Sequence, residues 1–166
     1  FGIIQMEQTE SMEDAYNKAT VAIHDARRTE ECFSFYDEET YKFQVLNQNL
    51  EEHFDTAIKD REFEVYYQPK YNMKDKSLTG CEALVRWRDK EGRLISPGLF
   101  IPIFERNGKI SKLDAYVFDR VCEQQRIWLD QGLEVVPVSV NLSGASLYRN
   151  DVLAKYMKIL EDYHLD

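Results

Sequence analysis

The decapeptide LTGCEALVRW, residues 78–87, decides how the rest of the sequence is interpreted. Its composition is that of a buried strand, yet it carries two charged side chains, Glu82 and Arg86. Side chains alternate between the two faces of a strand, so Glu82, Leu84 and Arg86 are predicted to share one face. The other face is uniformly apolar and is expected to pack against helices: Cys81, Ala83, Val85 and Trp87.

The segment before this strand predicts an antiparallel hairpin. Residues 62–72, EFEVYYQPKYN, alternate apolar and polar side chains, and the polar turn MKDKS, residues 73–77, separates them from the decapeptide. A parallel crossover needs about a dozen residues, so this connection is too short for one. We therefore expect the two strands to pair antiparallel.

Two helices are predicted after the hairpin. Ser96 and Pro97 are typical of a helix cap followed by a first-turn proline, and this short helix is expected to end at Gly108. A longer helix is predicted from Ser111 to Gly132, with apolar side chains at helical spacing.

Residues 135–143, VVPVSVNLS, have the valine content of a buried parallel strand. Alternation places Ser139, Asn141 and Ser143 on its polar face, toward its C-terminal end. From Asp151 the pattern is helical again. The order strand, strand, helix, helix, strand, helix predicts an α/β fold, the start of a barrel or of a doubly wound sheet.

The first sixty residues are predicted to form a strand, a helix, a second strand and a connecting helix. The first strand covers residues 1–7, and Ser11 begins a capped helix. A short strand is expected within residues 31–39, ECFSFYDEE. Residues 41–60 have apolar side chains at helical spacing, which would form an apolar stripe along one side of an otherwise polar helix. The segment contains no Pro or Gly, so it predicts a rigid helical connector.

Composition restricts the classes of partner and location. The 166 residues carry a net charge of −9, which disfavours a broad surface for a nucleic acid polymer or an anionic membrane. Cys32, Cys81 and Cys122 show no CxxC spacing, as is typical of reduced thiols in a cytoplasmic protein. No apolar run reaches the roughly 18 residues of a membrane span. The chain lacks an initiator Met and ends within a helical pattern, so we expect a segment of a longer protein.

Polar side chains near the ends of two strands predict a ligand site, because ligands of α/β folds bind at the C-terminal ends of strands. Oxygen-bearing side chains there suit a hard metal ion or a phosphate. Glu82 and Arg86 could equally form a solvent-facing pair of little energetic value, and Asn141 could simply satisfy a strand end. Spacing alone leaves both interpretations open.

Four motifs in order resemble the first half of an EAL domain, the family of cyclic di-GMP phosphodiesterases: YYQPKYN, CEALVRW, ISPGLFIPIFERNG and VPVSVNLS. The upstream stretches FGIIQ and AYNKATVAIHDARRTEECFSFYDEE are similar to the end of a GGDEF domain, the diguanylate cyclase fold. The resemblance implies a GGDEF-like end over residues 1–40, a connector helix over 41–60, and the N-terminal half of an EAL domain over 61–166. The implied fold is an incomplete TIM-like (β/α) barrel with an antiparallel first strand.

At matching positions, the resemblance implies that Glu82 and Asn141 are metal ligands and that Arg86 contacts the ligand phosphate. It implies that Gln68 and Leu84 line the dinucleotide pocket. Mg²⁺ or Mn²⁺ prefers such oxygen ligands, and a two-metal site would hydrolyse cyclic di-GMP to the linear dinucleotide. The family's other ligands are expected beyond Asp166, so we expect the chain alone to be inactive.

The implied partners are cyclic di-GMP and other domains of a bacterial signalling protein, located in the cytoplasm or at the cytoplasmic face of a membrane. Self-association into a homodimer through the open barrel edge is a further expectation. A different class stays open, in which the EAL domain is a catalytically silent receptor for cyclic di-GMP or a protein-interaction scaffold. Glu82, Arg86 and Asn141 favour the enzyme, since a receptor would be free to lose its metal ligands.

Overall fold

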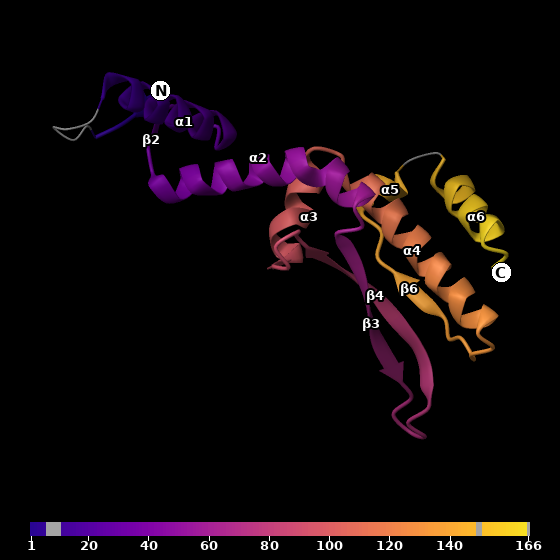
Figure 1. Ribbon diagram of the computed structural model, residues 1–166. Helices are drawn as coiled ribbons and strands as arrows, with labels where there is room; N and C mark the ends of the chain where they lie inside the picture. Colours follow the sequence, from indigo (N-terminus) through magenta and orange to yellow (C-terminus); the bar gives the residue numbers. More distant parts are fainter. Residues whose placement is uncertain (6–10, 149–150, 166) are drawn as a thin grey trace. The chain divides into compact units, whose positions relative to one another are not determined.

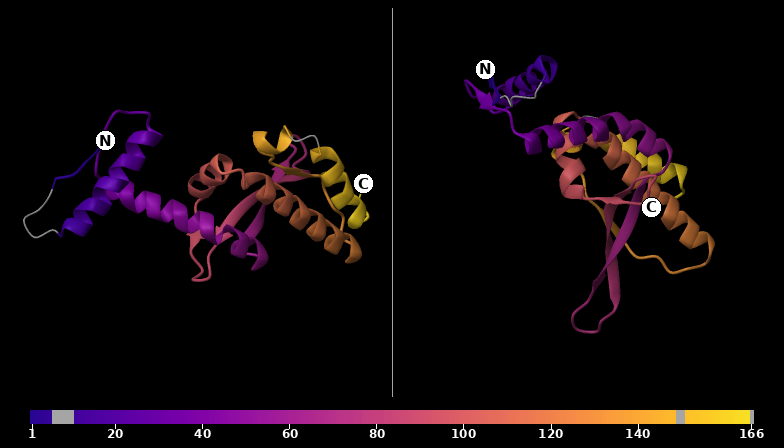
Figure 2. Two further views of the ribbon diagram at one scale, coloured as in Figure 1. Left: turned by 90° about the horizontal axis from the view of Figure 1, so that it is seen from above. Right: turned by 60° about the vertical axis from the view of Figure 1, so that its left-hand side comes forward.

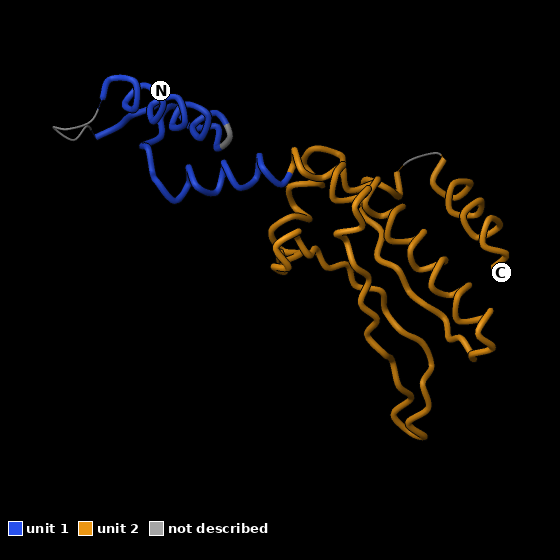
Figure 3. Tube along the Cα trace, viewed as in Figure 1, with its two compact units in different colours: residues 1–50 blue, residues 51–166 orange. Residues whose placement is uncertain are grey.

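The computed structural model describes residues 1–5, 11–148 and 151–165, which form two compact units, Phe1–Leu50 and Glu51–Asp166 (Figure 3). The first unit holds β1 (Gly2–Ile3), α1 (Met12–Arg28), β2 (Ser34–Phe35) and the first part of α2 (Glu38–Lys59). Helix α2 passes from the first unit into the second, which contains the remaining elements.

The first unit is a small strand–helix–strand arrangement. Strands β1 and β2 pair in parallel, with Gly2 opposite Ser34. A Cβ atom on Gly2 would lie 2.0 Å from the carbonyl oxygen of Ala19, so only glycine allows this contact between strand and helix. The Ser11 hydroxyl accepts a hydrogen bond from the backbone N–H of Asp14 at 3.1 Å, which confirms the predicted cap. The first strand was predicted over residues 1–7, but β1 covers only Gly2–Ile3. The last two predicted residues, 6 and 7, lie outside the described ones.

Helix α2 begins at Glu38, three residues before its predicted start. The reason is an Asp cap: the Asp37 carboxylate accepts hydrogen bonds from the Thr40 backbone N–H at 2.8 Å and from the Thr40 hydroxyl at 2.9 Å. Along the predicted apolar stripe, Phe54 is fully buried whereas Phe43 is 49% exposed.

The second unit is built on a four-stranded sheet (Figure 1). Strands β3 (Phe63–Tyr71) and β4 (Leu78–Arg88) form the predicted antiparallel hairpin. Strand β6 (Val138–Val140) pairs in parallel with β4, as predicted, and the short β5 (Leu94–Ile95) pairs with the end of β4. This partial sheet, with an antiparallel first strand, is consistent with an incomplete barrel.

The helices of the second unit are α3 (Pro97–Arg106), α4 (Ile110–Asp130), α5 (Gly144–Leu147) and α6 (Val152–Asp162). Figure 2 shows α4 along one face of the sheet, and α4 contacts β3, β4 and β6. None of the helices within the described ranges is long and apolar enough to cross a membrane.

Several helix boundaries match the sequence prediction and two features do not. Pro97 opens α3, and Gly132 follows α4 with a φ of +73°, as expected for helix stop signals. Helix α4 begins at Ile110, not at Ser111, with Lys109 in the cap position. The short helix α5 was not predicted at all.

The helix-facing side of β4 joins an aromatic core, as the alternation of side chains predicts. Trp87 is fully buried, with ring centroids 4.8 Å from Phe63 and 5.5 Å from Phe100. Phe54 of α2 and Phe104 of α3 complete the cluster, with centroids 4.6 Å apart. Each such side chain contributes about 1.5–3 kcal/mol on burial, so this cluster fixes β4 in place.

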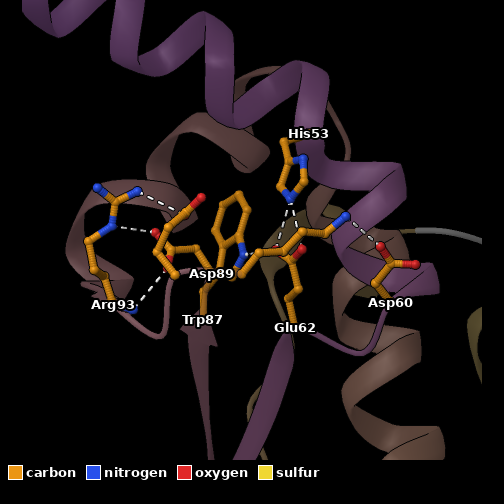
Figure 4. Close-up of polar contacts among 8 residues, drawn as sticks. His53, Asp60, Glu62, Trp87, Asp89 and Arg93 are labelled. Carbon is orange, nitrogen blue, oxygen red and sulfur yellow. Dashed lines mark hydrogen bonds and ion pairs between the residues drawn. The ribbon is translucent and has the colours of Figure 1, made fainter.

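A buried carboxylate ties α2 to the end of β4 (Figure 4). The Glu62 side chain is only 5% exposed and accepts a hydrogen bond from Trp87 Nε1 at 3.0 Å. His53 Nε2 lies 2.9 Å from both Glu62 carboxylate oxygens. Burying a carboxylate costs free energy unless it is hydrogen-bonded. Here Trp87 of β4 and His53 of α2 supply the hydrogen bonds to Glu62.

Candidate functional site

Strands β4 and β6 bring Glu82 and Asn141 together. Their pairing sets Glu82 opposite Ser139, and Asn141 follows two residues later on the same face. The Asn141 Nδ2 atom donates a hydrogen bond to Glu82 Oε1 at 2.9 Å. Asn141 lies just past the end of β6, as expected, whereas Glu82 lies in the middle of β4, because β4 extends beyond its pairing with β6.

A lysine completes this polar group. Lys70 Nζ donates a hydrogen bond to Ser139 Oγ at 2.7 Å and lies 3.6 Å from Glu82 Oε2. The Asn141 hydrogen bond, helped by the nearby Lys70 charge, lowers the pKa of Glu82 from its ordinary value. Glu82 is therefore ionised at neutral pH, which is the state that binds a cation.

Sequence reasoning missed Lys70, and it placed Ser139 on the polar face without giving it a role. The signal was available, because alternation along β3 puts Lys70 on the face of Gln68, which pairs with Glu82 across the hairpin. Gln68 itself is exposed and lies on this polar face. The polar group on this face consists of Gln68, Lys70, Glu82, Ser139 and Asn141.

A cavity of about 250 Å³ lies where β4 and β6 cease to pair. Among the predicted site residues, Leu84, Arg86 and Asn141 line it, and α3 and α4 contribute the remaining wall. Glu82 and Gln68 are not among its lining residues, so the predicted site residues are divided between this cavity and the polar group. Asn141 belongs to both the cavity and the polar group.

Arg86 is the basic residue of the cavity lining, which also includes the acidic Glu105 and Asp114. Arg86 Nη1 donates a hydrogen bond to the carbonyl oxygen of Val85 at 2.8 Å, and its guanidinium carbon lies 5.8 Å from the centroid of the Tyr66 ring. Within the described ranges Arg86 forms no ion pair with a carboxylate. Its planar donors are therefore suited to an anionic ligand such as a phosphate.

The donor types at Glu82 and Asn141 fit part of a divalent-cation site. A carboxylate and an amide oxygen are ligands that Mg²⁺ and Mn²⁺ prefer, although Asn141 now turns its amide N–H toward Glu82 and would have to rotate to offer Oδ1. Over the described part of the chain, no cluster of three or more His, Cys, Asp or Glu side chains suits a metal ion. These residues can therefore supply only part of a coordination sphere.

Known proteins match both the sequence and the fold. The sequence profile of the EAL domain matches residues 51–166. Signaling protein YkoW of Bacillus subtilis is 30% identical over 149 residues, covering 89% of this chain and 18% of YkoW. MucR of Pseudomonas aeruginosa, a bifunctional diguanylate cyclase/cyclic di-GMP phosphodiesterase, is 39% identical over 87 residues, covering 52% of this chain and 13% of MucR. The chain thus spans a small fraction of these relatives.

Two solved structures share the α/β fold. The PaMucR phosphodiesterase in complex with cyclic di-GMP superposes with a TM-score of 0.65 at 32% identity, covering 70% of this chain and 47% of that one. The EAL enzyme Bd1971, in its form bound to cAMP and cyclic di-GMP, gives 0.62 at 28% identity, covering 74% and 35%. The residues matched by the EAL profile contain the hairpin, the cavity and the Glu82–Asn141 contact, and the chain belongs to the EAL domain family.

Proposed function

We propose that this chain is part of a bacterial signalling protein whose EAL domain hydrolyses cyclic di-GMP to the linear dinucleotide. The observation that carries the proposal is the contact between Glu82 and Asn141, which puts two potential oxygen ligands side by side. The names of relatives support the substrate, since MucR is a cyclic di-GMP phosphodiesterase and its structure holds that dinucleotide.

Each proposed role follows from the chemistry of the side chain. Glu82 and Asn141 would hold a divalent cation, Mg²⁺ or Mn²⁺, which when bound lowers the pKa of a water molecule and stabilises charge on the phosphodiester. Arg86 would bind a phosphate oxygen through its planar donors. Leu84 would contact the dinucleotide from the cavity wall, and Gln68 from the polar face beside Glu82.

The chain alone would be inactive, because two oxygen donors are too few for an ion that takes about six. The other ligands would come from the remainder of the parent protein. Within this chain, residues 1–40 would be the end of a GGDEF-like domain, 41–60 a connector helix and 61–166 the first half of the EAL domain. The alignment with the signaling protein YkoW covers 89% of the chain and so extends upstream of residue 51, which supports a longer region of similarity than the EAL match alone. A cytoplasmic location would follow from such a signalling role.

The test compares the parent protein with this chain. Both are incubated with cyclic di-GMP and Mn²⁺, and the linear dinucleotide is measured by chromatography. We expect turnover by the parent, its loss in Glu82→Gln, and none by the chain alone. Turnover by the isolated chain would show that the count of missing ligands is wrong, and a parent that neither binds nor cleaves cyclic di-GMP would refute the proposal.

A second candidate function is supported by Lys70. Its ammonium group lies 3.6 Å from Glu82, so the carboxylate already has a fixed positive neighbour without a metal ion. With the Glu82 charge balanced by Lys70, the domain would not need a metal ion at Glu82 in order to bind cyclic di-GMP without turnover. Binding of cyclic di-GMP by the parent in EDTA, with no hydrolysis after Mn²⁺ is added, would favour the receptor over the enzyme.

A further inference from the structure

Asp114 is a buried carboxylate on the helix behind the candidate site. It lies in the second turn of α4, is 8% exposed, and lines the same cavity as Arg86 and Asn141. Its Oδ2 atom accepts three hydrogen bonds: from the backbone N–H of Ser143 at 2.9 Å, the Ser143 hydroxyl at 2.6 Å and the Ser146 hydroxyl at 2.6 Å. Hydrogen bonds to an ionised carboxylate are shorter and stronger than neutral ones, so this is a firm anchor.

The anchor holds the loop that follows β6. The Ser143 hydroxyl donates to Asp114 and accepts a hydrogen bond from the Ser146 backbone N–H at 3.2 Å, which caps α5. Strand β6 ends at Val140, so Asn141 and Leu142 are the only residues between the last strand pair and the anchored Ser143. The backbone of Asn141 is therefore fixed on one side by β4 and on the other by Asp114.

We propose that Asp114 is a positioning residue for Asn141. Through Ser143 it keeps the Asn141 side chain where it meets Glu82, although Asp114 is not itself a ligand. Without the carboxylate, the loop would lose three hydrogen bonds and gain freedom at the residue that must align with Glu82. The positioning of Asn141 by Asp114 follows from these contacts alone. Its effect on the binding of a metal ion rests on the function proposed above.

The experiment separates these two parts. In the ¹⁵N-labelled chain, the side-chain amide signals of Asn141, identified by their loss in Asn141→Asp, report the contact with Glu82. Asp114→Ala is compared with Asp114→Asn, which keeps an acceptor oxygen for the serine hydroxyls, and with Asp130→Asn, which removes an exposed carboxylate from the far end of α4. The same substitutions are then made in the parent protein, which would supply the remaining ligands, and the Mn²⁺ affinity of each parent variant is measured by titration.

We expect Asp114→Ala to shift the Asn141 amide signals to those of an amide without a hydrogen-bond partner and to weaken Mn²⁺ binding by the parent by about 10- to 100-fold, the usual effect of removing a group that orients a ligand. Asp114→Asn should restore most of both, and Asp130→Asn should match the wild type. Unchanged Asn141 signals in Asp114→Ala would overturn the proposal.

A folding failure would not end the test. If Asp114→Ala does not fold, Ser143→Ala removes only one hydroxyl of the anchor, and an unmoved Asn141 amide in that variant would equally overturn the proposal. A wild-type parent that binds no Mn²⁺ while Asn141 of the chain still responds to Asp114 would contradict the proposed metal role and leave the positioning intact.

Discussion

The substitution Trp87→Phe would test how strongly the buried carboxylate of Glu62 depends on its indole partner. Phenylalanine keeps a ring in the aromatic core but removes the Nε1–H that donates to Glu62 at 3.0 Å. A hydrogen bond to a charged group contributes about 1.5–3 kcal/mol, and the smaller ring leaves a void worth about 1–2 kcal/mol. We expect the free energy of unfolding to fall by about 2.5–5 kcal/mol, a large part of the 5–15 kcal/mol of an ordinary domain.

The assay is urea unfolding followed by far-ultraviolet circular dichroism, with Trp128→Phe as the matched control. Trp128 is half-buried against Tyr67, with ring centroids 5.2 Å apart, and its indole has no hydrogen bond within the described ranges. The control should therefore lose only the packing part, about 1–2 kcal/mol. Trp87→Phe that is no less stable than Trp128→Phe would refute the reasoning. The double variant Trp87→Phe/Glu62→Leu should recover stability, because it removes a buried carboxylate that has lost its indole donor.

Three further predictions concern the site and its surroundings. The pKa of Glu82 is lowered in the folded state from 4.5, so ionised Glu82 stabilises the fold above that pH, and this contribution is lost as the pH falls through the folded pKa. A ¹³C titration of Glu82 should therefore give a midpoint below 4.5, and the midpoint should rise in Lys70→Met. An unshifted midpoint would contradict this prediction. Tyr156→Phe should leave the melting temperature unchanged or higher, since the Tyr156 hydroxyl is buried without a partner among the described residues, and a lower value would reveal a hidden partner. Arg86→Ala should weaken cyclic di-GMP binding by the parent by at least tenfold in a titration, and equal affinity would exclude Arg86 from phosphate binding.

The parts of this fold that local rules determine could be predicted from the sequence. The hairpin follows from a connection too short for a crossover, and the split between Trp87 and Arg86 follows from strand alternation. The parallel pairing of residues 138–140 follows from their valine content. The start of α2 also follows from a local rule, because Asp37 caps the helix. The prediction relied on the apolar stripe instead and therefore started the helix too late.

Contacts between distant residues could not be predicted in this way. Asp114 meets Ser143 across 29 residues, and nothing in the spacing of α4 distinguishes this carboxylate from a solvated one. In the sequence, Glu62 is a polar residue that precedes a strand and gives no sign of being buried. Its burial depends on a hydrogen bond from Trp87, which lies 25 residues away. In α6, Tyr156 is buried whereas Leu153, three residues earlier, is 72% exposed, because the position of the neighbouring helix decides which side is covered.

The length of the β3–β4 hairpin has a consequence for local unfolding. Its base, where Phe63 pairs with Trp87, is fixed by the aromatic core, whereas its tip, where Tyr71 pairs with Leu78, has exposed side chains and an irregular register. Segments with few buried contacts open at lower free energy than the whole domain. Backbone amide protection should therefore decline from base to tip, and the pair of Gln68 and Glu82 lies on this gradient. The polar face of the site is thus expected to have a lower local stability than the aromatic core at the base of the hairpin.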